Sequence, residues 1–251
     1  MIEFNGLSKQ YGRFSAVDTL NLRVAPGELF GFLGPNGAGK TTTIRMMMGL
    51  LVPTRGSVSI DGYDCHADGV EVKRRIGYLP DNPIFYDYLR GHEILQFVAQ
   101  MHGFPRTQAK VRTERLLAEF GLDEAGDEFA VNYSMGMKKK LALACALIHQ
   151  PRVLILDEPI NGLDPRAARE VNERLLQCVT QGVTVFVSTH LLDMAERLCS
   201  RVGIIHHGKL VATGTLDEIR AATATNGSLE DVFLNLTNDA SATDSTLAHT
   251  S

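Results

Sequence analysis

The segment GPNGAGKTT, from Gly34 to Thr42, constrains the fold of this chain more than any other part of its sequence. It fits the pattern G-x-x-x-x-G-K-S/T and lies between a run that predicts a strand (28–34) and one that predicts a helix (39–51). Glycines in such a loop let backbone N–H groups surround phosphate groups, and the start of the helix adds partial positive charge. The spacing therefore predicts a phosphate-binding loop, and the strand and helix beside it disfavour a chance glycine-rich turn.

The side chains of this loop suggest separate roles. Lys40 is expected to reach the β and γ phosphates of a nucleotide, and the Thr41 hydroxyl is expected to ligate Mg²⁺. The residues predicted to contact the nucleotide here are Gly34, Pro35, Asn36, Gly37, Ala38, Gly39, Lys40, Thr41 and Thr42.

A second apolar run, RVLILDE, ends in two carboxylates, Asp157 and Glu158. In combination with the phosphate loop, they suggest divided roles at the end of one strand. Asp157 is expected to orient Mg²⁺ through its water shell, and Glu158 to polarise the attacking water. The alternative is a solvated acidic exit from the strand, which the phosphate loop disfavours.

Hydrophobic patterning predicts strands first, then helices, then alternating strands and helices. The predicted strands are 20–24, 28–34, 57–62, 74–80, 152–158 and 183–190, with a hairpin at 201–215. The predicted helices are 39–51, 92–101, 107–120 (with Thr107 as its cap), 166–179 and 228–236. Residues 238–251 are small and polar, and they are expected to be disordered.

Composition narrows the class of protein further. The chain has 251 residues, a net charge of −4 and four scattered cysteines, so it is expected to be a reduced, cytoplasmic, soluble domain with no nucleic-acid partner. No apolar run approaches the roughly 18 residues of a membrane span, and the first ten residues lack a signal-peptide core.

Several motifs, taken together and in their order along the chain, resemble the nucleotide-binding subunit of an ATP-binding cassette (ABC) transporter, from about Ile2 to Leu236. Besides GPNGAGKTT and LILDEP, the chain carries YSMGMKKK where the family has its helix-start motif, and NGLDP after the acidic pair. It also has a histidine after the next strand, His190, and an early aromatic residue, Tyr11. Single motifs of this kind are weak evidence, but their order makes the resemblance specific.

The resemblance implies an α/β, P-loop NTPase-type fold: a mainly parallel sheet, an N-terminal antiparallel β region and an inserted all-helical subdomain. The expected division is an ATP-binding core in two parts (1–80 and 151–220), a helical subdomain (81–150) and a C-terminal helix with a tail (221–251).

The resemblance also implies a mechanism in which two such domains pair head to tail around ATP and Mg²⁺. Ser134 and the N–H groups around Gly136 would meet the γ-phosphate bound by the partner domain. His190 would hold the γ-phosphate and the attacking water, Asp164 would link the two sites, and Tyr11 would stack on adenine.

Each of these residues has a simpler interpretation. Tyr11 fits an ordinary half-buried aromatic residue. His190 fits a cap for the helix that follows it, and Asp164 before Pro165 fits a helix N-cap. The run from Lys138 to Lys140 is interpreted as a solvated helix face.

Two positions depart from the commonest form of the family. Asp81 stands where a glutamine usually senses Mg²⁺ and water, so it either takes that role, acts through a water or leaves the role vacant. Met135 replaces the first glycine of the helix-start motif, and its side chain can point away if the local φ is negative.

The resemblance implies a polytopic membrane permease as partner, a second nucleotide-binding subunit (a second copy or a paralogue), and attachment to the inner face of the membrane through the permease. Residues 188–216 and 228–237 resemble a bacterial exporter-type subgroup. The alternatives are a soluble or regulatory ABC-type ATPase that is not coupled to transport, and an unrelated phosphate-loop kinase or GTPase.

Overall fold

The computed structural model describes residues 1–222 and 228–236, and the chain forms two compact units. The first unit comprises residues 1–72 and 186–251, and the second comprises residues 73–185. The strands are β1 (Ile2–Tyr11), β2 (Phe14–Val24), β3 (Leu29–Leu33), β4 (Arg55–Ile60), β5 (Tyr63–Asp64), β6 (Ile76–Leu79), β7 (Val153–Asp157), β8 (Thr184–Thr189), β9 (Arg201–His206) and β10 (Lys209–Gly214). The helices are α1 (Lys40–Met47), α2 (Gly69–Arg75), α3 (Gly91–Met101), α4 (Arg106–Glu119), α5 (Met135–Leu147), α6 (Pro165–Thr180), α7 (Leu192–Leu198) and α8 (Leu216–Ala222).

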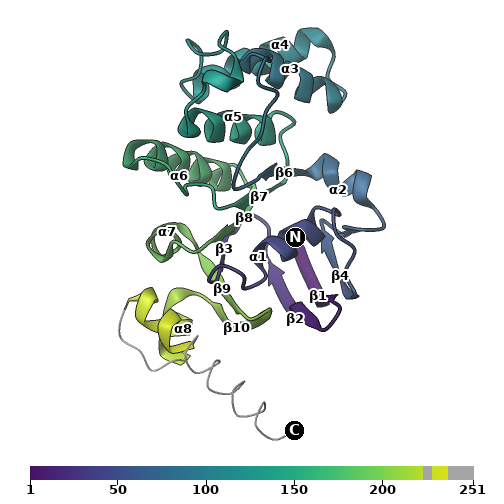
Figure 1. Ribbon diagram of the computed structural model, residues 1–251, viewed down its shortest axis with the longest axis vertical. Helices are drawn as coiled ribbons and strands as arrows, with labels where there is room; N and C mark the ends of the chain where they lie inside the picture. The colour runs from purple at the N-terminus through teal and green to yellow at the C-terminus, as the bar shows by residue number, and fades with distance from the viewer. Residues whose placement is uncertain (223–227, 237–251) are drawn as a thin grey trace, which may run out of the picture. The chain divides into compact units, whose positions relative to one another are not determined.

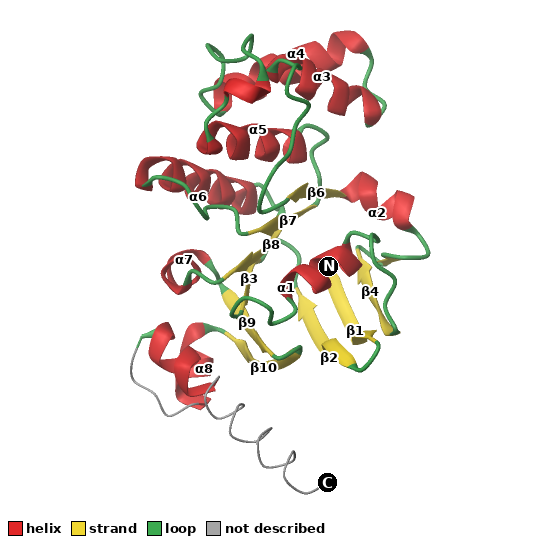
Figure 2. Ribbon diagram, viewed as in Figure 1, coloured by secondary structure: helices red, strands yellow, loops and turns green. Residues whose placement is uncertain are grey.

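An antiparallel sheet with the order β2-β1-β4-β5 opens the first unit, and Figure 2 shows β1, β2 and β4 side by side. Ile2 pairs with Val24 on β2 and with Ile60 on β4. The sequence did not reveal β1, because its register shifts between Phe4 and Leu7 break the alternation that marks a strand.

The larger sheet has the order β10-β9-β3-β8-β7-β6, and β3 pairs with β9, and β6 with β7, in parallel. All residues of β3, β7 and β8 are buried, as their continuous apolar sequences predict for strands covered on both faces. The predicted hairpin is confirmed: β9 and β10 join through His207 and Gly208, which have φ values of 44° and 78°. Two positive φ angles are typical of a tight hairpin turn.

An aromatic cluster forms the core of the first unit. The ring of Phe186 on β8 lies 5.8 Å from that of Phe30 and 5.4 Å from that of Phe32, both on β3. Phe4 on β1 contacts the same Phe186 ring at 6.2 Å between centroids, so the antiparallel sheet packs onto β8, the neighbour of β3 in the larger sheet.

The second unit carries the helices of the expected subdomain. In Figure 1, α3 and α4 lie side by side, with α5 beneath them and α6 beyond α5. Gly91 opens α3 against the hydroxyl of Tyr133, which would lie 2.2 Å from a Cβ at that position. A side chain at this position would therefore displace the Tyr133 hydroxyl, which donates to the carbonyl oxygen of Ala125 at 2.6 Å.

Three expectations need correction. The helix predicted at 107–120 begins at Arg106 after Pro105, so Thr107 is not its cap. The segment predicted as a strand from residue 74 begins instead with the end of α2, which the sequence analysis missed. The third correction concerns Lys139, which is not solvated but 1% exposed.

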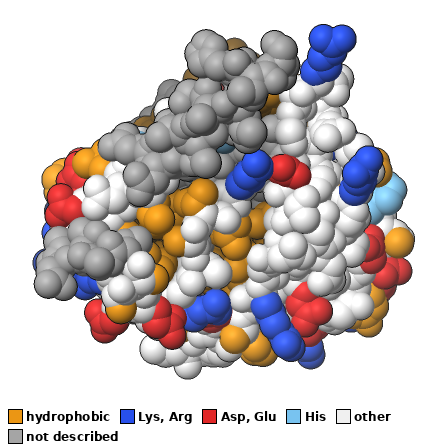
Figure 3. Space-filling view, turned by 90° about the horizontal axis from the view of Figure 1, so that it is seen from below, with side chains coloured by type: hydrophobic (Ala, Val, Ile, Leu, Met, Phe, Trp, Pro, Cys, Tyr) orange, Lys and Arg blue, Asp and Glu red, His pale blue; other side chains and the backbone are white. Residues whose placement is uncertain are grey.

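The C-terminal segment forms a helix at 229–236, as predicted, and Ser228 and Asp231 cap its start through reciprocal hydrogen bonds. The expected disorder of 238–251 lies outside the described residues. The face in Figure 3 carries hydrophobic side chains at its centre, with acidic and basic side chains interspersed around them. In the described part of the chain, no helix combines the length and apolar character that a membrane span requires.

Candidate functional site

The phosphate loop closes tightly on the first unit's own backbone. A Cβ on Gly34 would lie 2.4 Å from the carbonyl oxygen of Ile205, and a Cβ on Gly39 would lie 2.4 Å from that of Ala16. Gly39 also has a φ of 110°, which side chains rarely adopt. The carbonyl of Ala38 accepts a hydrogen bond from the N–H of Gly208 at 3.0 Å. The backbone around Ala16 and the backbone from Ile205 to Gly208 thus hold the loop in place within the chain itself.

Lys40 places its ammonium group inside this loop. The side chain is 6% exposed, and Nζ donates to the carbonyl oxygens of Gly34 at 2.6 Å and Pro35 at 3.2 Å. Lys40 is also the first residue of α1, whose first turn has no acidic side chain. A buried cation and the N-terminus of a helix at one loop make a site for an anion.

Two further predicted residues belong to the first unit. His190 directly follows β8 and is exposed, and α7 begins with Leu191 as its N-cap, so His190 is not the cap of that helix. Tyr11 ends β1 beside the turn to β2 and is 48% exposed, with Lys9 Nζ 5.2 Å from the centre of its ring. At this exposure Tyr11 also fits the simpler interpretation of a half-buried aromatic residue, and its stacking on adenine stays a prediction.

In the second unit, Asp157 ends β7 and Glu158 follows, with 5% and 7% exposure. Glu158 has a φ of 49°, which is uncommon for a residue with a side chain and is found mostly where the surrounding structure enforces it. Its carbonyl oxygen accepts two hydrogen bonds, from the N–H of Asn161 at 3.2 Å and from Lys139 Nζ at 2.6 Å. The alternative of a solvated acidic exit, which the sequence already disfavoured, does not apply to this pair, because both residues are buried.

Asp81 lies in the same group of side chains. Its Oδ1 lies 3.8 Å from Lys139 Nζ and accepts a long hydrogen bond, 3.4 Å, from Asn161 Nδ2. Burial lowers the pKa of Lys139, and the neighbouring Asp81, Glu158 and Asp157 carboxylates oppose that shift. The structure thus joins Asp81 to Glu158 through a lysine that the sequence analysis had placed in solvent.

The helix-start motif adopts the geometry of a capped helix. The Ser134 hydroxyl accepts a hydrogen bond from the N–H of Met137 at 3.2 Å, so Ser134 is the N-cap of α5. Met135 is not among the residues with positive φ, so the backbone condition under which its side chain can point away is met, and the residue is 47% exposed. At Gly136 the nearest atom to an added Cβ would be 3.6 Å away, an ordinary contact, and φ is not positive. The fold itself does not require a glycine at this position.

Asp164 caps α6, as predicted, and accepts hydrogen bonds from the N–H groups of Arg166 and Ala167 at 3.0 Å. The bond from Ala167 is the main cause that lowers the pKa of Asp164. The N-cap role in α6 therefore accounts for an aspartate at this position. The implied role of Asp164 in linking the two ATP sites of a dimer remains a prediction.

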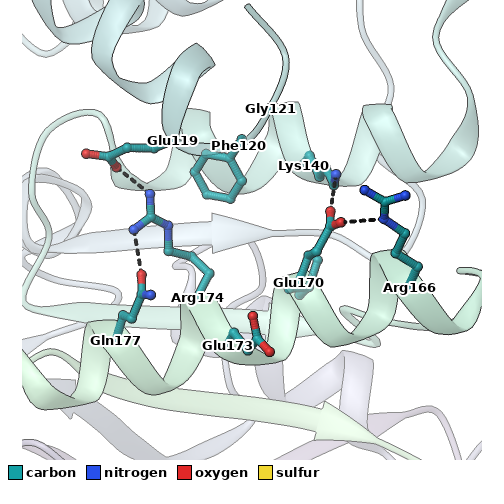
Figure 4. A pocket seen from close by; sticks show the side chains of 10 residues that line it. Glu119, Phe120, Gly121, Lys140, Arg166, Glu170, Glu173, Arg174 and Gln177 are labelled. Atoms are coloured by element: carbon teal, nitrogen blue, oxygen red, sulfur yellow. Dashed lines mark hydrogen bonds and ion pairs between the residues drawn. The ribbon is translucent and has the colours of Figure 1, made fainter.

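Ion pairs connect α6 to α4 and α5 around a cavity of about 510 Å³ (Figure 4). Arg174 on α6 pairs with Glu119 at the end of α4, and Glu170 on α6 pairs with Lys140 on α5. The ion pair between Glu170 and Lys140 thereby connects α5, which Ser134 caps, to α6, which Asp164 caps. Lys140 is paired as well, so a second member of the lysine run is not a free solvated charge.

The sequence analysis missed Lys139 and Asn161. Lys139 stands three and four positions before Ala142 and Leu143, which are both buried, so helical spacing places it on a buried face of α5. That spacing was the available signal. No sequence pattern indicated that Asn161 would contact Asp81.

A protein-family model described as "ABC transporter" matches residues 17–161. The chain is 38% identical over 243 residues to "Probable multidrug ABC transporter ATP-binding protein YbhF" of Escherichia coli (strain K12), covering 95% of this chain and 42% of that protein. It is 40% identical to "Bacitracin transport ATP-binding protein BcrA" of Bacillus licheniformis, covering 88% and 71% of the two chains. The chain thus spans less than half the length of the first of these relatives.

Among solved structures, one described as "Structure of ATP binding subunit of ABC transporter" superimposes with a TM-score of 0.88. It is 35% identical and covers 94% of this chain and 99% of that one. The predicted fold class, a P-loop NTPase-type α/β fold with a mostly parallel sheet and an antiparallel region, is confirmed by this likeness and by the sheet order.

Proposed function

Because the chain belongs to the ABC transporter family, we propose that it binds and hydrolyses ATP to power transport, in the export direction, through a separate membrane subunit. The observation that carries the proposal is the Lys40 ammonium, buried within a glycine-closed loop at the N-terminus of α1. Relatives at this level of identity are named as ATP-binding proteins of transport and resistance systems, which disfavours a soluble or regulatory ATPase.

The loop from Gly34 to Thr42 holds the phosphates, and Tyr11 stacks on the base. Glu158 orients and polarises the attacking water, and His190 holds the γ-phosphate. The division into a two-part ATP-binding core, a helical subdomain and a C-terminal segment belongs to this proposal as well.

Magnesium suits the donors that the chain offers. Within residues 1–222 and 228–236, no group of three or more His, Cys, Asp or Glu side chains could hold a metal by itself. Mg²⁺ is usually held by one or two carboxylates together with substrate phosphates, and not in a cage of protein ligands. Thr41 and Asp157 would hold it here, with Asp81 as a further contact, and the bound ion would neutralise charge on the β and γ phosphates.

A second cassette, either another copy or a paralogue, completes the site. Gly136 carries this part of the proposal, because the chain's own packing leaves room for a Cβ there. The close approach that a glycine permits is then to something outside the chain, namely the γ-phosphate bound by the partner cassette. Ser134 orients the N–H groups of the first turn toward that phosphate, and Asp164 lies at the same interface.

The membrane subunit docks on the segment between β6 and α3. Ile84, Tyr86 and Tyr88 are 91%, 77% and 82% exposed, and Phe97 and Met101 on α3 are 54% and 72% exposed. Tyr86 and Tyr88 also line an open hollow of about 550 Å³. Large exposed apolar side chains of this kind mark interaction surfaces, and the proposed occupant is a cytoplasmic loop of the permease. The chain is thereby held at the inner face of the membrane.

Lys40→Ala and Glu158→Gln test the proposal. Steady-state ATPase activity of Lys40→Ala should fall to background, because the phosphates lose their buried cation. Glu158→Gln should still bind ATP and should accumulate a closed dimer, measured by size-exclusion chromatography with ATP and Mg²⁺. Unchanged turnover in Lys40→Ala would refute the catalytic assignment. A missing permease could by itself keep Glu158→Gln monomeric. A gene next to this one that encodes a protein with several membrane spans would identify that permease, and adding the permease to the assay is the control.

A further inference from the structure

A buried lysine on α5 joins two loops of the second unit. Lys139 is 1% exposed, and its Nζ donates to the Glu158 carbonyl oxygen at 2.6 Å and lies 3.8 Å from Asp81 Oδ1. A buried ammonium group is costly unless it is hydrogen-bonded and paired. Lys139 has both kinds of partner, one in the segment after β6 and one directly after β7.

The hydrogen bond from Lys139 to the Glu158 carbonyl oxygen holds a residue whose backbone conformation is uncommon. Glu158 has a φ of 49°, a conformation that is uncommon for a residue with a side chain and persists only where its surroundings hold it. The N–H of Asn161 and the ammonium of Lys139 fix the direction of the Glu158 carbonyl. These two donors thereby hold the backbone from which the Glu158 side chain projects.

The ion pair between Lys139 and Asp81 balances the negative charge of the Asp81 carboxylate. Asp81 Oδ1 faces Lys139 and Asn161, and Oδ2 accepts a hydrogen bond from Asn82 Nδ2 at 3.2 Å. Asp81, Asp157 and Glu158 bring three carboxylates to the ends of two adjacent strands, and Lys139 brings a cation to the same place. The lysine thus offsets the negative charge that an aspartate introduces there.

We propose that Lys139 is a positioning residue for ATP hydrolysis, which fixes the backbone of Glu158 and the carboxylate of Asp81 as one hydrogen-bonded unit. The proposal rests on the proposed ATPase function. Lys139 is buried and donates to the Glu158 carbonyl, so its role is exerted through Glu158. Its loss should slow the chemical step and leave ATP binding in place.

The test compares Lys139→Met with Lys110→Met in the full 251-residue chain. Methionine keeps the length and burial of the side chain but removes the charge and the donor. Lys110 is a matched control, because its side chain is 68% exposed on α4. In Lys139→Met, kcat should fall by about 10- to 100-fold, as for other residues that orient catalytic groups. KM for ATP should stay within about threefold.

Two further variants separate positioning from general stability. Lys139→Arg keeps the cation and should retain more activity than Lys139→Met. Asp81→Asn should lower kcat less than Lys139→Met does, and the double variant should be no slower than Lys139→Met alone, because residues that act as a unit are not additive. Additive losses, or a kcat for folded Lys139→Met within about twofold of the Lys110→Met value, would overturn the proposal.

An amide-exchange measurement keeps the inference testable apart from activity. The N–H of Asn161 should exchange about tenfold faster in Lys139→Met than in Lys110→Met, because the Glu158 carbonyl that accepts its bond is released. Unchanged exchange would refute the positioning role, even in a chain that does not hydrolyse ATP. If Lys139→Met does not fold, Lys139→Arg takes its place. Its kcat should be lower than that of Lys110→Met while KM is preserved, and an unaltered kcat together with unaltered exchange of the Asn161 N–H would count against the proposal. Failure of the proposed function itself is distinct, because the unmodified chain would then be no faster than Lys40→Ala.

Discussion

The phosphate loop and the start of α5 are both glycine-containing helix starts, but they use glycine for opposite reasons. In the phosphate loop, a Cβ on Gly39 would lie 2.4 Å from a backbone oxygen of the chain itself, and φ is 110°. At the start of α5, Gly136 has a normal φ and room for a methyl group. The first glycine is needed to build the site, whereas the second is explained by what approaches it from outside.

Gly39→Ala should have the largest effect. The clash with the Ala16 carbonyl and the positive φ together should lower the free energy of unfolding by about 2–4 kcal/mol. ATPase activity should fall to background, because the loop would move away from the phosphates. Urea unfolding followed by circular dichroism, together with a steady-state ATPase assay, measures both effects.

Gly62→Ala is the matched control for this variant. Gly62 has a φ of 84° but no atom near its added Cβ, so it isolates the cost of the conformation, about 1–2 kcal/mol. If the two variants lost the same stability, the tight closure of the phosphate loop would not be a constraint, and the contrast with Gly136 would fail.

Gly136→Ala should separate stability from activity. Alanine in the first turn of α5 should raise the free energy of unfolding by about 0.5–1 kcal/mol, because glycine is the poorer helix former. ATPase activity should nevertheless fall by about tenfold or more, since the methyl group would face the phosphate held by the partner cassette. Gly69→Ala, at the first residue of α2, makes the same change with open space around it and should leave activity unchanged. Full activity in Gly136→Ala would remove the main argument for a phosphate contact there.

The same contrast explains which features could be predicted from sequence. The phosphate loop was predictable because its spacing, its strand and its helix are all local. The strand β1 was not, because its bulges disturb the alternation of apolar residues.

Lys139 illustrates the limit for the candidate site. A run of three lysines indicates a solvated face when it is judged by charge alone, whereas position along the helix places the middle one among buried residues. Its partners could not be predicted, because Asp81 and Glu158 lie 58 and 19 positions away in the chain and only the folded sheet brings them together. The positive φ of Glu158 is equally a product of that packing.

Glu170→Gln should have the smallest effect, and it tests the connection between α5 and α6. The hydrogen bond from Lys140 lowers the pKa of Glu170, so the ion pair stabilises the fold at neutral pH, above the usual glutamate pKa of about 4.3. That contribution is lost as the pH falls through the lowered pKa of the folded state. Because the Glu170 side chain is 39% exposed, the loss at neutral pH should not exceed about 1 kcal/mol.

The measurement is urea unfolding of Glu170→Gln and of the unmodified chain at neutral pH and at a series of lower pH values, along which the two free energies of unfolding should converge. Glu173→Gln removes the same charge from the same helix without touching Lys140. If Glu173→Gln lost as much stability as Glu170→Gln, the effect would be one of net helix charge. If only Glu170→Gln also slowed the ATPase, the pair would be shown to hold the start of α5 in place, and the helix-start motif would then depend on its own chain for orientation as well as on its partner for a ligand.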